Sequence, residues 1–193
     1  FMHWRNTREH YGSAAIGLHW LMLLILIAVY ASIEMRTFFP KGSDPRELVK
    51  LWHFMLGLSV LTLVSIRAVI HVIGPSPDIQ PVPPKWQSLL ARSMHILLYL
   101  FMIAMPLAGW LLLSAEGKPI PYFGLHLPAL ISQNKATAEL LKEVHETVGN
   151  IGYFIIGLHA AAALFHHYIV RDNTLIRLLP GKRRPWQGHE RTE

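Results

Sequence analysis

The chain of 193 residues is 52% hydrophobic and only 16% charged, and it contains no cysteine. An ordinary soluble domain carries about 25% charged residues, so this composition, with its long uncharged stretches, indicates a membrane protein. The lack of cysteine excludes disulfides, thiolate-bound zinc, iron–sulfur clusters and covalently attached haem of the Cys-x-x-Cys-His kind. The net charge of +6 includes a basic C-terminal tail, which we interpret as a contact for anionic lipid, so we expect no nucleic-acid partner.

Four apolar segments follow one another, and each has the roughly 20 residues that a helix needs to cross the hydrocarbon core. Because lipid offers the backbone no hydrogen-bond partners, segments of this length must be helices. The sequence therefore predicts an all-α, integral membrane four-helix bundle of up-down-up-down topology, forming one domain over residues 1–193. The expected helices cover residues 14–35, 48–73, 88–114 and 136–171, and a basic tail covers residues 172–193.

The three connections differ in character. Residues 34–50 form a short charged connection with a turn, residues 74–87 hold five prolines, and residues 116–143 form the longest connection, whose second half has a helical pattern. Eleven basic residues lie on the side of the two termini and seven on the other side. Because basic residues are retained on the cytoplasmic side, we expect both termini in the cytoplasm.

Four histidines lie in or near these apolar segments: His19, His53, His145 and His159. His145 and His159 share one segment, and the 14 residues of helix between them rise roughly 21 Å and turn about 40° short of four full turns. Their imidazoles therefore point from nearly the same face at two depths. Depth pairs His19 with His159 near the cytoplasmic surface, and His53 with His145 near the outer one. Each imidazole could simply form a hydrogen bond to a neighbouring helix. Four histidines at matching depths nevertheless favour two metal centres, each held by two histidines.

Other histidines have different positions. His95 opens the third segment at a depth similar to His19, so it could replace one of the proposed ligands. His166 lies one heptad after His159 and nearer the cytoplasmic surface, which suits a quinone partner or a proton donor. We assign no chemistry to the remaining ones: His71 and His167 are expected at the interface, His126 in the outer connection, and His3, His10 and His189 in solvent.

Two further groups of residues could serve such centres. Glycines near the histidines could make room for a flat macrocycle, although close helix packing explains them equally well. They include Gly17, Gly57, Gly149, Gly152 and Gly157. Seven outer basic residues could attract a small anion, or could simply form a solvated surface. They are Arg36, Lys41, Arg46, Lys50, Lys118, Lys135 and Lys142.

Three stretches around the histidines form a distinctive set: Gly17-Leu-His-Trp20, Trp52-His-Phe-Met-Leu-Gly57, and His145-Glu-Thr-Val-Gly-Asn-Ile-Gly-Tyr153 continuing to Gly157-Leu-His-Ala160. Together with Asp172-Asn-Thr-Leu175, they resemble the bacterial cytochrome b561 family of small di-haem membrane proteins. The resemblance covers about residues 8–184 and is most specific in the last apolar segment.

The resemblance implies two non-covalent b-type haems, one near each surface. Carried over by motif, His19 and His159 would ligate one iron, and His53 and His145 the other. Within the family, the chain is similar to superoxide oxidases, which implies that superoxide gives an electron at the outer face and that ubiquinone is reduced in the membrane. His166 matches the position associated with quinone.

Alternatives remain open at this point. A cytochrome b anchor subunit of a hydrogenase or formate dehydrogenase would use a similar bundle, although the short loops offer little docking surface, so we expect no obligate protein partner. A transporter or proton channel would use the histidines as relays and would be colourless. The electron donor could also be ascorbate or a protein.

Overall fold

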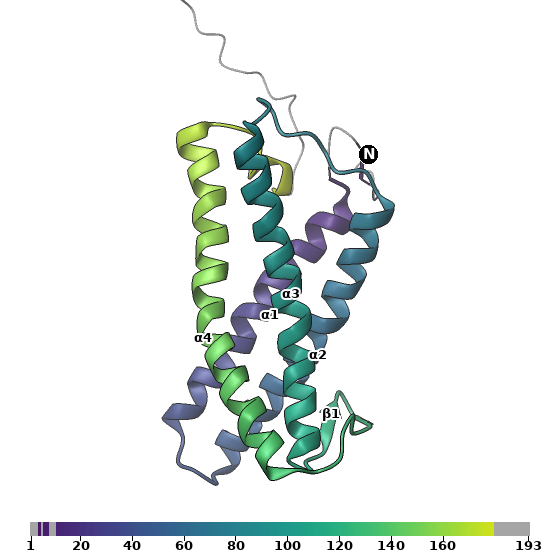
Figure 1. Cartoon of the computed structure of the whole chain (residues 1–193), viewed down its shortest axis with the longest axis vertical. Coiled ribbons are helices and arrows are strands. Elements are labelled where there is room, and N and C mark those ends of the chain that lie inside the picture. Colours follow the sequence, from purple (N-terminus) through teal and green to yellow (C-terminus); the bar gives the residue numbers. More distant parts are fainter. Residues whose placement is uncertain (1–3, 5, 8–10, 180–193) are drawn as a thin grey trace, which may run out of the picture.

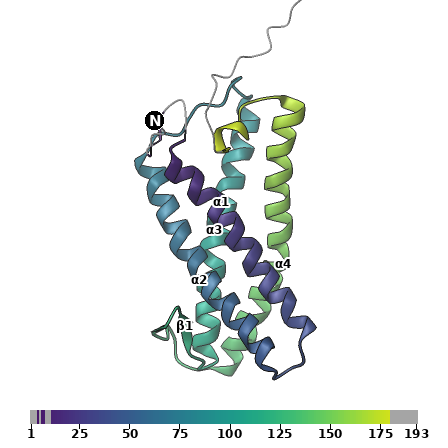
Figure 2. The same cartoon turned by 180° about the vertical axis from the view of Figure 1, so that it is seen from behind.

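The computed structural model describes residue 4, residues 6–7 and residues 11–179. In this part of the chain, four long helices stand together as a bundle (Figures 1 and 2). They are α1 (Ser13–Met35), α2 (Asp44–Ile73), α3 (Lys85–Ala115) and α4 (Lys135–Phe165). The shorter elements are 3-10 helices at Arg36–Phe38 and Ile176–Leu178, a π-helical turn at His166–Val170, and strands β1 (Ile120–Tyr122) and β2 (Leu125–Leu127). The tail beyond residue 179, with His3, His10 and His189, lies outside the described residues.

All four helices are long and apolar enough to cross a membrane, which confirms the predicted four-helix membrane bundle. The helix starts were predicted less well, because apolar runs do not include a polar first turn. Helix α2 begins at Asp44, before the predicted residue 48, with Pro45 in its first turn and Asp44 and Glu47 as acidic residues there. Proline fits a first turn because its missing N–H has no partner there, and carboxylates favour the positive end of the helix dipole.

Successive helices run in opposite directions, so the connections gather at two ends. The start of α1, the α2–α3 connection and the end of α4 lie together at what we call the termini end, at the top of Figure 1. The α1–α2 connection and a short β-hairpin lie at the opposite end, called the hairpin end. In the hairpin, β1 pairs with β2 in antiparallel register, Ile120 opposite Leu127. The sequence did not predict this hairpin.

The middle of the bundle is filled by a buried cluster of Met22, Val60, Val64, Phe101 and Met102, contributed by α1, α2 and α3. Helix α4 joins this core closely at Gly152. A Cβ at Gly152 would lie 2.2 Å from the Tyr30 hydroxyl and 2.3 Å from Cζ of Phe101, closer than any stable contact. In this structure Gly152 therefore serves close helix packing, the second of the two roles weighed for the glycines.

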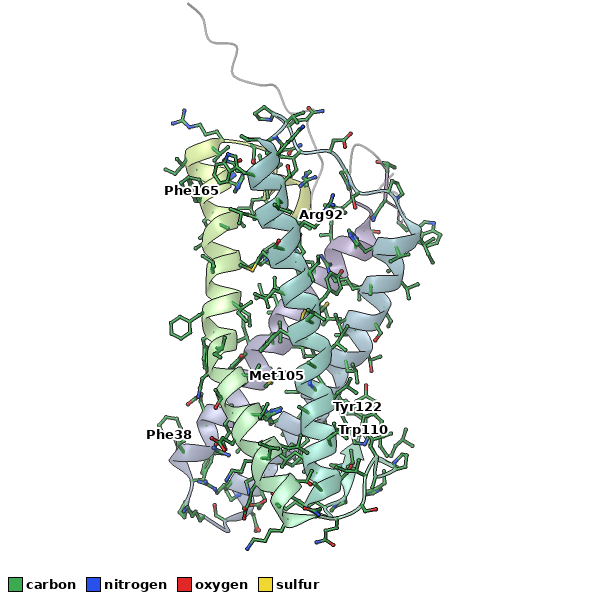
Figure 3. All side chains as sticks on the ribbon, viewed as in Figure 1. Phe38, Arg92, Met105, Trp110, Tyr122 and Phe165 are labelled. Atoms are coloured by element: carbon green, nitrogen blue, oxygen red, sulfur yellow. The ribbon has the colours of Figure 1, made fainter. Side chains whose placement is uncertain are left out.

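Large apolar side chains point outward around the bundle (Figure 3). Phe38 is 80% exposed and Phe154 is 79% exposed. In water so many exposed apolar side chains would favour aggregation, whereas in lipid they have the apolar surroundings that they require. The outward-facing surface thus agrees with a membrane bundle.

The segment after α4 folds back over the termini end. The chain reverses at Arg171, which has a left-handed backbone with φ of 59°, and the following residues bond to the α2–α3 connection. Asn173 N–H donates to the Gln80 carbonyl at 3.1 Å, and Gln80 N–H donates to Oδ1 of Asn173 at 2.9 Å. The indole N–H of Trp20 donates to the Leu178 carbonyl at 2.7 Å. We call residues 172–178 the clasp, because they join α1, α4 and the α2–α3 connection.

Candidate functional site

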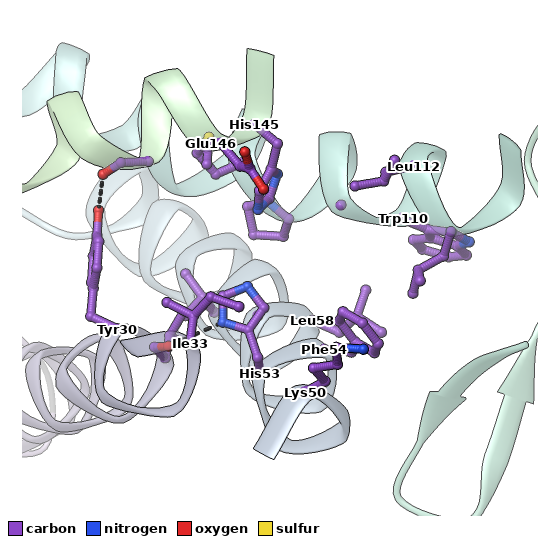
Figure 4. Close-up of a pocket in the computed structure, with 18 of the residues that line it drawn as sticks. Tyr30, Ile33, Lys50, His53, Phe54, Leu58, Trp110, Leu112, His145 and Glu146 are labelled. Carbon is purple, nitrogen blue, oxygen red and sulfur yellow. Dashed lines mark hydrogen bonds between the residues drawn. The ribbon is translucent and has the colours of Figure 1, made fainter. Parts of the chain in front are cut away.

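Two of the singled-out histidines face each other at the hairpin end. His53 of α2 and His145 of α4 have ring centroids 6.3 Å apart, with their planes at 83° (Figure 4). Nδ1 of His53 lies 3.0 Å from the Val29 carbonyl oxygen. Because a carbonyl only accepts, Nδ1 must carry the proton, and Nε2 keeps a lone pair for a metal. A metal-binding histidine is usually oriented by a hydrogen bond from the ring nitrogen that does not bind the metal, as Nδ1 of His53 would be here.

A cavity of about 630 Å³ lies between these rings and the four helices. This volume falls within the range of about 300–1,000 Å³ typical of cofactor and ligand sites. Its walls are mostly apolar and include Leu26, Phe101 and Met102, and Gly57 lies in the wall with no atom within 4 Å of an added Cβ. The cavity therefore offers a largely apolar space beside the two imidazoles.

The hairpin-end pair fits an iron porphyrin by a direct test of distance. An imidazole nitrogen binds a metal ion at about 2.0–2.1 Å, so two imidazoles on opposite sides of one ion would have ring centroids roughly 6 Å apart. The observed separation of 6.3 Å agrees with this value. Among the described residues, no three histidine, aspartate or glutamate side chains are placed to hold a bare metal ion. Two imidazoles alone suit a metal that brings other ligands, as haem iron does.

The cationic side chains that line the cavity lie toward the hairpin end, at what we call its mouth. Five of the seven predicted basic residues line it: Arg36, Arg46, Lys50, Lys118 and Lys142. Two of them form ion pairs, Lys50 with Glu47 at 2.7 Å and Lys118 with Glu116 at 2.9 Å. Arg46 instead donates to backbone carbonyls of the α1–α2 connection.

The remaining two cations have no such partner. In the described part of the chain, neither Arg36 nor Lys142 forms an ion pair within 4.0 Å. Arg36 also interacts electrostatically with His53. Glu34 and Glu146 line the same cavity, and Glu34 accepts a hydrogen bond from Tyr153 at 3.0 Å. Arg36 and Lys142 are therefore the charges best placed to attract an anion.

Three histidines gather near the termini end. His95 of α3 and His159 of α4 have ring centroids 5.6 Å apart, and His19 of α1 interacts electrostatically with both. Arg67 of α2 interacts with the same three imidazoles and donates to the Ala15 carbonyl at 3.0 Å. The structure thus brings the predicted pair His19 and His159 into one cluster and adds His95, whose position in the sequence had left it as an alternative ligand.

His166 forms a pair that the sequence did not predict. Its Nδ1 lies 2.6 Å from Oδ2 of Asp172 in the clasp, and Asp172 is only 2% exposed. The clasp also holds Arg177, whose guanidinium lies over the Tyr11 ring and donates to the Pro77 carbonyl. Burial lowers the pKa of Arg177, while Tyr11, Asp172 and Asp78 act in the opposite direction. The only hint of Asp172 in the sequence was its place in the motif after the last apolar segment.

Residues 10–181 match the sequence profile of the family described as prokaryotic cytochrome b561. The chain belongs to this family. The protein "Cytochrome b561 homolog 1" of Escherichia coli (strain K12) is 41% identical over 175 residues, covering 91% of this chain and 99% of the relative. The "Probable superoxide oxidase CybB" of Yersinia pestis is also 41% identical over 175 residues, covering 91% and 98%. "Cytochrome b561 homolog 2" of Escherichia coli (strain K12) is 31% identical over 180 residues, covering 92% and 95%.

Membership of the cytochrome b561 family confirms the resemblance, and it makes the chain a multi-pass membrane protein of electron transport. The family implies haem b, and the hairpin-end pair and its cavity fit such a group. The family also argues against the transporter or channel considered from the sequence. Of the other histidines, His71 stacks on Tyr99 and also interacts electrostatically with His95, and His126 lies on strand β2.

Proposed function

We propose that this cytochrome takes electrons from superoxide at its hairpin end and delivers them to ubiquinone in the membrane. Two superoxide ions give two electrons and leave as two molecules of dioxygen, while one ubiquinone takes up these electrons and two protons to become ubiquinol. The pairing of His53 with His145 across a cavity with a cationic mouth is the observation that supports this most strongly.

The four histidines would hold two haems, His53 with His145 and His19 with His159. When bound, haem b supplies one-electron transfer, and its potential depends on burial and on the groups around it. The Val29 carbonyl fixes the ring of His53 through Nδ1. With two histidines for each haem, the chain would hold the groups for electron transfer and not for oxygen binding.

The substrates would approach from different sides. Superoxide is a small anion, and Arg36 and Lys142 would raise its concentration at the cavity mouth. Ubiquinone is apolar and would arrive through lipid at the termini end, where His166 would meet its carbonyl oxygen. From the count of basic residues in the sequence, the termini end would face the cytoplasm, and the protein would lie in a bacterial inner membrane.

The test is rapid mixing of purified, oxidised holoprotein with superoxide while the haem absorbance is recorded. We expect haem reduction together with faster loss of superoxide, followed by reoxidation when ubiquinone-1 is present. Haems that stay oxidised while superoxide decays at its spontaneous rate would reject the proposal. The anchor-subunit alternative would gain support if the protein co-purified with an iron–sulfur subunit and did not react with superoxide.

A further inference from the structure

The buried carboxylate of Asp172 has no part in the electron-transfer site, yet it lies 2.6 Å from Nδ1 of His166. We propose that Asp172 is a positioning residue for proton delivery: it holds His166 so that this histidine can hand protons to the reduced quinone. The inference rests on the proposed function, because it assigns the protons that ubiquinone needs.

The fold holds Asp172 by several independent contacts. Its Oδ1 accepts from the Thr174 backbone N–H at 2.8 Å, and its own N–H donates to the His166 carbonyl at 3.2 Å. Asn173 is tied to Gln80 through both its backbone and its side chain. With Oδ1 engaged and the backbone fixed, Oδ2 is directed at the imidazole of His166.

This contact decides which nitrogen of His166 faces a substrate. The Asp172 side chain is 1% exposed and the His166 side chain 21% exposed, so the carboxylate is enclosed and the ring reaches the edge of the bundle. An ionised carboxylate only accepts hydrogen bonds, so Nδ1 of His166 must carry a proton. Nε2 is then the nitrogen that gains and loses the exchangeable proton, and the buried carboxylate stabilises the ring when both nitrogens carry protons.

The proposed step conserves atoms and electrons. For each electron that the proposed function brings to ubiquinone, the Nε2–H bond of protonated His166 breaks and an O–H bond forms on the quinone. The electron pair of the broken N–H bond stays on Nε2. Water at the termini end then returns a proton to Nε2, and a second cycle completes ubiquinol. Asp172 keeps its hydrogen bond to Nδ1 throughout and is not itself protonated.

A purely structural role for Asp172 must be separated from this one, and the substitution Asp172→Asn does so. The amide oxygen of Asn can still accept from Thr174, whereas its NH₂ group offers Nδ1 a donor in place of an acceptor. The ring would then be held in the opposite tautomer without a carboxylate beside it. His166→Gln removes the proton carrier itself. Asn173→Ala is the matched control, because it loosens the clasp at Gln80 and leaves the Asp172–His166 contact in place.

The experiment measures steady-state reduction of ubiquinone-1 by superoxide with each full-length holoprotein. Two further readouts involve no proton transfer: the rate of haem reduction by superoxide, and the reoxidation of reduced haem by ferricyanide. We expect Asp172→Asn to lower kcat for ubiquinone-1 at least about a hundredfold, the lower end of what a general acid contributes, with KM within about twofold and both other rates unchanged. His166→Gln should behave alike, and the double variant should lose no more than either single one.

Three outcomes would overturn the inference. The first is that Asp172→Asn keeps kcat within twofold of the original chain. The second is that it slows all three rates, or loses haem, to the same degree as Asn173→Ala, which would make Asp172 a structural residue only. The third is that the double variant loses the product of the two single effects, which would mean independent roles. If the original chain does not reduce ubiquinone-1 at all, the proposed function itself fails and this inference fails with it.

Discussion

The two ends of the bundle hold histidine clusters in contrasting surroundings. At the hairpin end, His53 and His145 face each other across a cavity of about 630 Å³ whose mouth carries unpaired cations. At the termini end, His95 and His159 lie closer together with His19 beside them, and the clasp folds over this end with the buried Asp172–His166 pair. The first arrangement suits a charged donor from water, and the second suits an apolar acceptor that needs protons.

The largest effect should come from removing a hairpin-end ligand. His53→Ala or His145→Ala should abolish binding of that haem, because a single imidazole and an apolar cavity hold iron far less firmly than two imidazoles. We expect the haem absorbance per chain to fall by about half and the reaction with superoxide to be lost. Retention of all haem in either variant would remove the basis for assigning different tasks to the two ends.

The termini-end cluster has one imidazole more than a haem iron needs. We expect His19→Ala and His159→Ala each to lose one haem, and His95→Ala to keep both, as the family motif implies. Haem content and the visible spectrum of the three variants decide the question. Loss of haem in His95→Ala with retention in His19→Ala would show instead that the closer pair in the structure, His95 with His159, binds the iron.

Packing between the two ends should be sensitive at Gly152. Gly152→Ala would place Cβ 2.2 Å from the Tyr30 hydroxyl, so the α1–α4 contact must shift, at a cost of about 1–3 kcal/mol. Thermal unfolding in detergent should therefore occur at a lower temperature. Gly157→Ala on the same helix is the control, because an added Cβ there meets no atom within 4 Å. Equal stability of the two variants would contradict the described packing.

The smallest effect concerns the cations of the hairpin end. Replacing Arg36 and Lys142 with glutamine should lower the second-order rate of haem reduction by superoxide about threefold to tenfold, and should weaken its dependence on salt. The double replacement of Lys41 and Lys135, which do not line the cavity, is the control. An equal loss in both double variants would mean that overall charge matters and the cavity mouth does not.

The sequence predicted the bundle well because membrane helices depend on a simple property, the length of an uncharged apolar run. It also placed His53 and His145 together, because helical spacing and alternating topology fix depth. Depth did not decide between His19 and His95, since both lie at the termini end and only the rotation of α1 and α3 determines which ring meets His159. That rotation depends on side-chain packing throughout the bundle.

The clasp and the hairpin could not be predicted from periodicity. Strands β1 and β2 have only three residues each, too few for an alternating pattern to stand out. The partnership of Asp172 with His166 depends on a chain reversal at Arg171, where a left-handed backbone is unusual for a residue other than glycine. Such local reversals bring together residues that helical spacing would place apart.

The most direct measurement for the central claim is the haem content of the purified chain, determined from the absorbance of extracted haem b against the protein concentration. The account predicts two haems per chain and a spectrum of iron with two axial imidazoles. A single haem per chain, or a colourless protein, would contradict it.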